Sequence, residues 1–292
     1  MTTWQRPPQR PSIDERTRVL VMTGAGISAE SGLATFRGAG GLWDGQPVER
    51  VATPEGFAAD PALVWRFYSE RRAQAAAALP NRAHRALAEL EARLGDRFLL
   101  ATQNVDGLHQ RAGSQRVVEM HGSLWRTRCS VCPAAPVEDR GLVEPPLPRC
   151  ARCGGLLRPA IVWFGELLDA ADTRRIERFI VSSARGASRL VFLAVGTSGN
   201  VWPAAGYVSL ARSAGADTWL VNLDSAENVG AFDHFVQGPA GEVLAPLLRV
   251  ENGDRGDDPA RGDDGARGDA GPDGPPRERG EVTPGEGRAS YP

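Results

Sequence analysis

The chain contains no lysine, although it has 34 arginines among its 292 residues. High-GC codon usage is one interpretation of this absence, and the other is that an enzyme acting on modified lysines offers none of its own. The formal net charge of −2 gives no reason to expect nucleic acid or an acidic membrane as the main partner. No run of about 18 apolar residues is present, so no membrane-spanning helix is expected. Residues 1–16 lack the apolar segment of a secretory signal, and we therefore expect a cytoplasmic protein.

Cysteine is also scarce, because the chain has only four. They form two C-x-x-C pairs, Cys129 with Cys132 and Cys150 with Cys153, separated by 17 residues. This spacing is typical of a zinc ribbon in which four thiolates hold one ion. Two disulfides are the alternative, which the absence of a secretory signal disfavours, and a redox pair would not explain two such motifs. We predict one structural zinc with no coordination position left open for catalysis.

Large apolar side chains almost disappear after Val250. Residues 251–292 are rich in Gly, Pro, Asp and Arg, with eleven acidic and six basic side chains. Such a segment cannot bury enough surface to offset its ordering entropy, so we predict a disordered tail. From Ile13 to Val250 short apolar runs alternate with helical patterns, as they do in α/β sheet proteins.

The stretch from Arg18 to Trp43 begins as a nucleotide-binding strand and loop. Residues 19–22 are continuously apolar, and Gly24, Gly26 and Ala29 occupy the G-x-G-x-x-G/A positions at which the backbone approaches a pyrophosphate. A dehydrogenase would continue into a second strand that ends in an acidic residue. Here Gly32 ends the helix early and a glycine-rich loop follows, with Asp44 at about the right distance but in no strand. The pattern predicts a dinucleotide site without hydride transfer.

Five apolar runs are candidate strands, at 18–23, 97–102, 116–119, 189–195 and 217–222. The longer runs end in polar or glycine residues, at 23–24, 102–104, 196–198 and 222–224. Ligands of open α/β sheets bind at the carboxyl ends of the strands, so these residues predict one continuous site. Residues 60–79 predict a helix, with Asp60 as N-cap, Pro61 at its first position and Pro80 after its end. Residues 125–158 show little helical or strand periodicity.

Two histidines follow strand ends near the expected site. His109 lies in the segment from Gln103, and His121 stands before a glycine. An imidazole titrates near neutrality, so a histidine here can act as a general base. The alternative is that Asn104 and Asp106 only make turn hydrogen bonds, with His109 at a helical position behind the loop. His121 is the better candidate for the base.

These motifs, in this order, resemble those of the sirtuin family. The resemblance runs from about residue 17 to 249 and rests on Gly24–Ser28, Thr35–Arg37, Thr102–Asp106, His121–Gly122, the paired C-x-x-C, Gly196–Ser198 and Asn222–Leu223. The visible departure is Val105, where the family often has Ile. The resemblance implies an α/β fold, with a Rossmann-like parallel sheet covered by helices on both faces and a small zinc-ribbon and helical domain. The catalytic domain would span 13–250, its large part about 13–50, 81–122 and 159–250, its small part about 51–80 and 123–158.

The resemblance also implies an NAD-dependent protein-lysine deacylase that consumes NAD. The acyl oxygen would attack the ribose carbon as nicotinamide leaves, and His121 would then deprotonate a ribose hydroxyl, with Asn104 as the second catalytic residue. Asp106 and Ile27 would hold the carboxamide. The residues implied in NAD binding are Gly24, Ala25, Gly26, Ile27, Ser28, Phe36, Arg37, Trp43, Gln103, Asn104, Val105, Asp106, Gly196, Thr197, Ser198, Asn222, Leu223, Asp224 and Ala240.

The substrate residues are implied in the same way. The peptide would lie as a strand between 162–166, including Val162, Phe164 and Gly165, and 199–201. Tyr68 and Arg71 share one helix face, and Tyr-x-x-Arg at this place is similar to the bacterial and mitochondrial desuccinylase group. A phenol and a guanidinium would bind the distal carboxylate of succinyl-, malonyl- or glutaryl-lysine, with some deacetylation remaining. The alternative is a solvated basic face that Arg71 shares with Arg66 and Arg72.

Other functions use the same features. The chain could be chiefly a deacetylase, or a protein mono-ADP-ribosyltransferase that also consumes NAD. An NAD(P) oxidoreductase would also use the glycine loop, but this chain lacks the second strand and the acidic residue that such an enzyme needs. A nucleic-acid-binding zinc ribbon would use Arg126, Arg128, Arg149 and Arg152, but it has no aromatic platform beyond Trp125. We expect a monomer whose partners are acylated lysine side chains of proteins, with no nucleic acid and no membrane.

Overall fold

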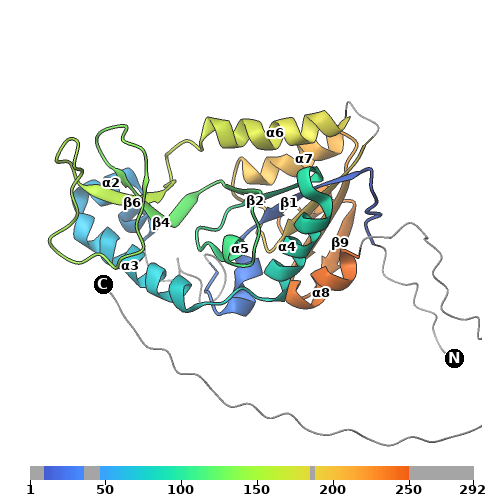
Figure 1. The fold of residues 1–292 in the computed structure, drawn as a ribbon, viewed down its shortest axis with the longest axis horizontal. Helices are drawn as coiled ribbons and strands as arrows, with labels where there is room; N and C mark the ends of the chain where they lie inside the picture. The colour runs from blue at the N-terminus through green and yellow to red at the C-terminus, as the bar shows by residue number, and fades with distance from the viewer. Residues whose placement is uncertain (1–9, 36–46, 185–187, 250–292) are drawn as a thin grey trace, which may run out of the picture. The chain divides into compact units, whose positions relative to one another are not determined.

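A computed structural model describes residues 10–35, 47–184 and 188–249, and in these residues the main element is a six-stranded parallel sheet (Figure 1). Its order is β3-β2-β1-β7-β8-β9. The strands are β1 (Thr17–Thr23), β2 (Phe98–Thr102), β3 (Val117–Glu119), β7 (Arg189–Val195), β8 (Asp217–Asn222) and β9 (His234–Gln237). Every neighbouring pair is parallel. From β1 the chain adds β2 and then β3 on one side, and it then adds β7, β8 and β9 on the other side of β1. The direction of strand addition reverses between β1 and β7, so the sheet has a topological switch point there.

The five predicted strands are confirmed, and β9 was not predicted. Its four residues alternate between half-buried and exposed positions at the edge of the sheet, so they lack the continuous apolar run of the central strands. Each central strand contains a continuous apolar run because the sheet is buried on both faces. Val19 and Val21 of β1 belong to one core, and Leu20 and Met22 belong to the other.

Helices cover both faces of the sheet, as the resemblance implied. The first core includes side chains from α4 (Arg82–Leu94) and α8 (Ala240–Leu247). The second includes side chains from α6 (Ala170–Ala184) and α7 (Tyr207–Ser213). In Figure 1, α6 and α7 lie on the opposite side of the sheet from α4 and α8. The central strands β2, β1, β7 and β8 are therefore buried between two helical layers.

A second, antiparallel sheet has the order β5-β4-β6 and consists of β4 (Gly122–Cys129), β5 (Val137–Glu138) and β6 (Leu157–Ile161). These strands were not predicted, because residues 125–158 show little strand periodicity. The strands β4 and β6 pair across more than twenty residues and with a register shift, and β5 has only two residues, both exposed, so no clean alternation marks these strands. The third core lies between this sheet and the helices α1 (Val48–Val51), α2 (Pro54–Ala59) and α3 (Pro61–Ala77).

The predicted helix over 60–79 is α3, two residues shorter at its end. The Asp60 carboxylate accepts a hydrogen bond from Leu63 N at 2.9 Å, as expected of an N-cap. Ala78 is already extended, and the next residue, Leu79, is the one in which Pro80 disfavours helical geometry. The short helices are η1 (Ala25–Ser31), η2 (Gly95–Arg97), α5 (Leu108–Arg111), η3 (Ala204–Gly206) and η4 (Val229–Ala231).

Among the described residues, no helix is both long and apolar enough to cross a membrane. The predicted tail, 251–292, lies outside the described residues, as do Phe36, Arg37 and Trp43.

Candidate active site

Two glycine turns meet at the switch point of the large sheet. Gly24 N donates to Val195 O at 3.0 Å, and Gly26 N donates to Gly196 O at 2.9 Å. A Cβ atom on Gly26 would lie 2.7 Å from Gly196 Cα, and one on Gly196, where φ is +63°, would lie 2.3 Å from Ile27 N. The backbones after β1 and β7 therefore touch directly, and only glycine permits that approach. The helix that follows is η1, which ends at Gly32 as predicted but is a 3₁₀ rather than an α-helix.

Asn104 and Asp106 connect the loop after β2 to this glycine turn. Asn104 Nδ2 donates to Gly24 O at 3.1 Å and to Ser28 Oγ at 3.2 Å. Ser28 Oγ in turn donates to Asp106 Oδ2 at 2.8 Å. Asp106 also accepts from Leu108 N at 2.8 Å, so the interpretation as a local turn is correct for that oxygen alone. Burial raises the pKa of Asp106, and the hydrogen bonds from Leu108 and Ser28 oppose that rise.

His109 lies behind the loop, as the helical position predicted. It is buried in α5, and its Nε2 is 2.9 Å from Thr23 Oγ1, which also donates to Thr102 Oγ1 at 2.8 Å. Its ring centre is 4.8 Å from that of His84, whose Nε2 is 3.5 Å from Ser28 Oγ. Burial lowers the pKa of both histidines, that of His84 to about 4. These neutral rings pack under the site.

His121 stands between β3 and β4 with one ring nitrogen fixed. Its Nδ1 is 3.1 Å from Gln103 O. A carbonyl oxygen only accepts, so Nδ1 carries the proton and Nε2 keeps its lone pair. Burial lowers the pKa of His121, against the opposing effect of the bond to Gln103. The ring is therefore neutral near pH 7, as a general base must be.

The predicted joining of the four strand ends is also present on the side of β7 and β8. Gln103 Nε2 donates to Thr197 Oγ1 at 3.2 Å, and Asn222 Nδ2 donates to Thr197 O at 3.0 Å. The remaining predicted residues there are Ser198, Leu223 and Asp224, all exposed, and Ala240, buried at the start of α8. One chain of hydrogen bonds thus connects the ends of β1, β2, β7 and β8.

Tyr68 and Arg71 lie on one side of α3, in the third core. Tyr68 is buried, and its hydroxyl oxygen accepts a hydrogen bond from Trp163 Nε1 at 2.9 Å. Burial raises the pKa of Tyr68, so the phenol stays protonated. The Arg71 side chain is 14% exposed, and its guanidinium carbon is 3.4 Å from the centre of the Phe67 ring. Arg71 Nη1 donates to Phe67 O at 2.8 Å, whereas its buried Nε has no hydrogen-bond partner.

The three arginines of α3 do not form one solvated basic face. Arg66 is exposed, but Arg72 is buried, with its Nε donating to Leu124 O at 2.7 Å and its Nη1 to Asp139 Oδ2 at 3.1 Å. Arg72 therefore ties α3 to the second sheet. Both arginines keep one buried donor without a partner, Nε of Arg71 and Nη2 of Arg72, but Arg71 is the partly exposed one and is not tied to the second sheet.

The segments predicted to hold the peptide border this region. Val162 N donates to His121 O at 2.9 Å, and Phe164 N donates to Ala52 O at 3.0 Å. Gly165 has φ +86°, a left-handed turn directly after them. Val105, the other predicted residue here, accepts at its carbonyl from Leu124 N at 2.9 Å.

The four cysteines form one cluster, with Sγ atoms within 4.8 Å of one another. Cys129 and Cys153 Sγ are 3.5 Å apart, and Cys132 and Cys150 Sγ are 3.7 Å apart. Four thiolates at about 2.3 Å from one tetrahedral zinc would be about 3.8 Å apart. The same thiols are free rather than joined in disulfides. Val131 N and Cys132 N point at Cys129 Sγ, which stabilises a thiolate there. The cluster fits a structural zinc.

Comparison with known proteins decides the family. The Sir2 family model matches residues 24–203. This chain belongs to the Sir2 family. Among its curated Sir2-family relatives, NAD-dependent protein deacylase 2 of Pyrobaculum aerophilum is 51% identical over 78% of this chain and 89% of its own length. The NAD-dependent protein deacylase of Caulobacter vibrioides is 49% identical over 78% of this chain and 93% of its own.

Solved Sir2 structures have the same fold. A Sir2 homologue in complex with NAD is 42% identical and superposes with a TM-score of 0.72, covering 80% of this chain and 89% of that one. A mutant Sir2 homologue in complex with ADP-ribose is 40% identical, with a TM-score of 0.73 over 80% of this chain and 91% of that one. The α/β fold implied by the sequence motifs is confirmed.

Three residues that support the candidate site were missed by the motifs. His84 is the first. A signal was available in the sequence, because Asn81 is a typical helix N-cap, and its side chain accepts a hydrogen bond from His84 N at the start of α4. Glu30 is another, because its carboxylate accepts from Gly241 N at 2.7 Å and ties η1 to α8. Trp163 was taken only as part of the peptide segment, whereas it holds Tyr68. Their partners are distant in sequence, so no local spacing marks the latter two.

Proposed function

We propose that this chain is an NAD-dependent protein-lysine deacylase that releases free lysine, nicotinamide and O-acyl-ADP-ribose. The observation that carries the proposal is the hydrogen-bonded chain through Gly24, Asn104, Ser28 and Asp106 at the switch point of a parallel sheet, where such sheets bind dinucleotides. Relatives that are named NAD-dependent protein deacylases, and Sir2 structures that hold NAD or ADP-ribose, support the same activity.

The turn from Gly24 to Ser28 would hold the pyrophosphate, because it follows β1 at the switch point of the sheet, where the backbone of such turns approaches phosphates. Gln103 and Asn104 would line the ribose, and Asp106 would accept from the carboxamide together with the backbone at Ile27. Thr197, Asn222 and the start of α8 would bind the adenosine half. The roles of Phe36, Arg37 and Trp43 in closing over the dinucleotide remain a prediction.

His121 would act as the general base. Its Nδ1 proton is held by Gln103 O, so Nε2 is the atom that takes the proton from a ribose hydroxyl. Deprotonation turns that hydroxyl into a nucleophile that attacks the acyl carbon, whose oxygen is by then bonded to the ribose. Uptake of one water and cleavage of the bond from the acyl carbon to the lysine nitrogen would then release free lysine and O-acyl-ADP-ribose. Asn104, which reaches the glycine turn through Gly24 O, would orient the ribose for loss of nicotinamide.

We further propose that the enzyme prefers acidic acyl groups: succinyl, malonyl and glutaryl. Arg71 Nε is a buried donor without a partner, and the Tyr68 oxygen already accepts from Trp163, which leaves its proton to donate. A distal carboxylate would satisfy both donors, and such charge-assisted hydrogen bonds are short and strong. An acetyl group would leave both unsatisfied, so acetyl-lysine would be the poorer substrate. The alternative is an enzyme that is chiefly a deacetylase.

Zinc would be held by Cys129, Cys132, Cys150 and Cys153, where it fixes the turns of β4 and β6. Four protein ligands close its coordination shell, so it would supply stability rather than chemistry. We propose the division into a large domain (about 13–50, 81–122 and 159–250) and a small one (about 51–80 and 123–158). We also propose that the chain acts as a monomer in the cytoplasm, where thiols stay reduced.

The test is to incubate the protein with acetyl- and succinyl-lysine peptides, with and without NAD, and to follow the peptide masses. Deacylation only with NAD, lost in His121→Ala, supports the proposal. Transfer of label from the adenylate of NAD to protein, without deacylation, would favour a mono-ADP-ribosyltransferase. Formation of NADH would favour an oxidoreductase.

A further inference from the structure

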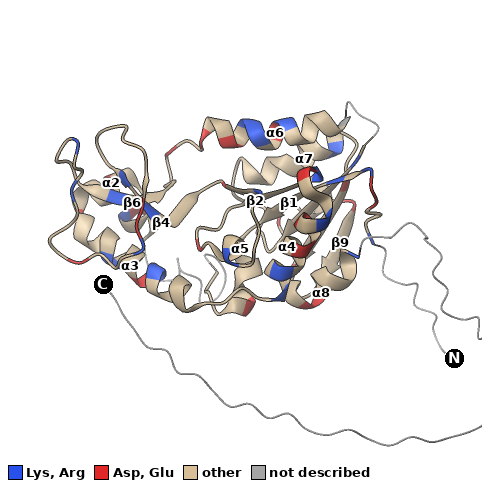
Figure 2. Ribbon diagram, in the orientation of Figure 1, with Lys and Arg blue, Asp and Glu red and all other residues tan. Residues whose placement is uncertain are grey.

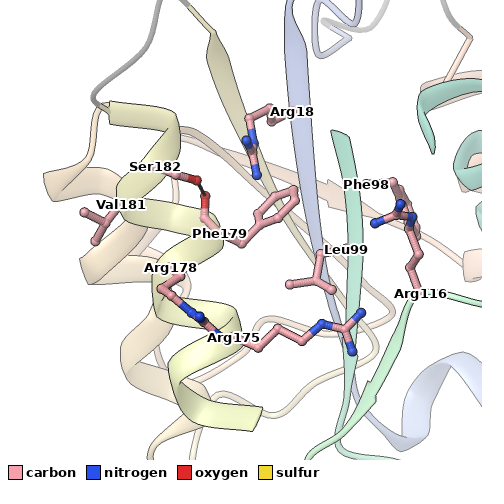
Figure 3. Close-up of a pocket in the computed structure, with 9 residues that line it drawn as sticks. All are labelled: Arg18, Phe98, Leu99, Arg116, Arg175, Arg178, Phe179, Val181 and Ser182. Atoms are coloured by element: carbon pink, nitrogen blue, oxygen red, sulfur yellow. Dashed lines mark hydrogen bonds between the residues drawn. The ribbon is translucent and has the colours of Figure 1, made fainter. Parts of the chain in front are cut away.

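A groove rich in arginine lies at the amino-terminal ends of strands in the large sheet, whereas the glycine turns lie at the carboxyl ends. It is about 580 Å³ in volume and is bounded by α6 and by the amino-terminal ends of β1 and β2 (Figure 3). Its charged lining comes from Arg18 of β1, Arg175 and Arg178 of α6, and Arg116 just before β3. Leu99 and Phe179 form the apolar part of the lining and belong to the core beneath α6.

These four guanidinium groups have few partners. Arg18 Nε is buried without a hydrogen bond, and the guanidinium carbon lies 4.2 Å from the centre of the Phe179 ring. Arg178 Nε donates to Arg174 O at 3.2 Å. Across residues 10–35, 47–184 and 188–249, none of the four is among the arginines that form an ion pair with a carboxylate.

Acidic groups act on this cluster only from a distance. The charge of Asp96 acts on Arg18, and that of Asp172 acts on Arg175, but neither makes a contact short enough to be an ion pair. Arginine cannot be deprotonated in proteins, so all four groups stay charged. Along α6, Arg174, Arg175 and Arg178 alternate with Asp172 and Glu177, and Figure 2 shows both basic and acidic positions on its ribbon. The groove therefore gathers four positive charges whose donors are largely unused.

We propose that this groove binds an oligophosphate group. Guanidinium forks match phosphate oxygens and bind them in pairs. Arg175 and Arg178 share one helix face, and Arg18 lies on the sheet side of the groove beyond the Phe179 ring, so guanidinium groups line the groove from both the helix and the sheet (Figure 3). The volume is that of a small-molecule site. A triphosphate concentrates its charges in such a space, whereas same-face carboxylates of an extended peptide are about 7 Å apart.

The groove is distinct from the proposed NAD site. Arg18 precedes Thr23 by five residues on β1, which corresponds to about 16 Å along the strand. The first glycine turn follows Thr23, so a dinucleotide bound there and an oligophosphate in the groove would lie at opposite ends of the strands. The inference goes beyond the proposed function, and binding in the groove does not require deacylation.

The experiment is isothermal titration calorimetry of the full chain with sodium tripolyphosphate, with ADP-ribose present at saturation to fill the NAD site. We expect one bound tripolyphosphate per chain. The double variant Arg175→Gln, Arg178→Gln should bind it at least tenfold more weakly, since each guanidinium donates charge-assisted hydrogen bonds worth roughly a factor of ten or more. Arg174→Gln is the matched control, because Arg174 is exposed on the same helix and does not line the groove.

The control should change the dissociation constant less than twofold. No binding in the presence of ADP-ribose, or an equal loss in the control and the double variant, would overturn the inference. If the double variant does not fold, Arg116→Gln, whose side chain is exposed, carries the same expectation.

Two further titrations identify the source of the phosphate. Tighter binding of ATP than of tripolyphosphate would indicate a nucleoside polyphosphate, and the reverse would indicate an inorganic chain. Citrate, or an acidic peptide, bound as tightly as tripolyphosphate would refute the assignment to phosphate.

Discussion

Replacing Arg71 by methionine tests the acyl preference. The guanidinium is 14% exposed, rests on the Phe67 ring and has a buried Nε without a partner. Methionine keeps most of the apolar contact while removing the donors. Loss of a charge-assisted hydrogen bond to a carboxylate costs about 1.5–3 kcal/mol. That loss corresponds to roughly a 10- to 100-fold fall in kcat/KM for succinyl-lysine peptide.

Acetyl-lysine has no distal carboxylate, so its kcat/KM should change less than about threefold in the same variant. The assay is a parallel mass measurement of product formation from matched succinyl- and acetyl-lysine peptides at saturating NAD. Arg66→Met is the control, because Arg66 is exposed on the same helix, and it should leave both rates near those of the unmodified enzyme. Equal losses on both peptides in Arg71→Met would refute the reasoning.

Three other predictions concern the base, the metal and the glycine turn. His121→Ala should lower deacylation by about 10²–10⁴-fold while NAD still binds, measured by calorimetry beside rates. Because burial lowers the pKa of His121, kcat/KM should fall only below its ordinary value of 6.5 as the base becomes protonated, and an acid limb well above 6.5 would contradict this role. Metal analysis should find one zinc per chain, and chelation should lower the Tm; a chelated protein that stayed folded and fully active would count against the site. Gly196→Ala should lose NAD binding through its 2.3 Å contact with Ile27 N, whereas Gly215→Ala, at φ +80° with nothing within 4 Å, should lose only about 1–2 kcal/mol of stability.

The sequence predicts the large sheet better than the small one. Strands such as β7 and β8 contain a continuous apolar run, over 190–195 and 219–221, because both faces are buried there, and that run is visible locally. The strands β4 and β6 contain arginine, threonine and proline, and their pairing depends on a partner thirty residues away, so no local pattern marks them. The edge strand β9 is too short and too exposed to be recognised.

The site divides in the same way. Motifs predicted the glycine turn, Asn104 and His121, because their roles depend on residue type at a strand end. They did not predict which arginine of α3 is structural. Arg71 and Arg72 are adjacent in sequence, and only the contacts of Arg72 with Leu124 O and Asp139 separate their roles.

The most direct test of the central claim is the stoichiometry of the reaction followed by mass. With succinyl-lysine peptide and NAD, the account predicts that one nicotinamide and one O-succinyl-ADP-ribose form for each lysine freed. Free succinate released without nicotinamide, or NAD consumed without loss of the acyl group, would contradict it.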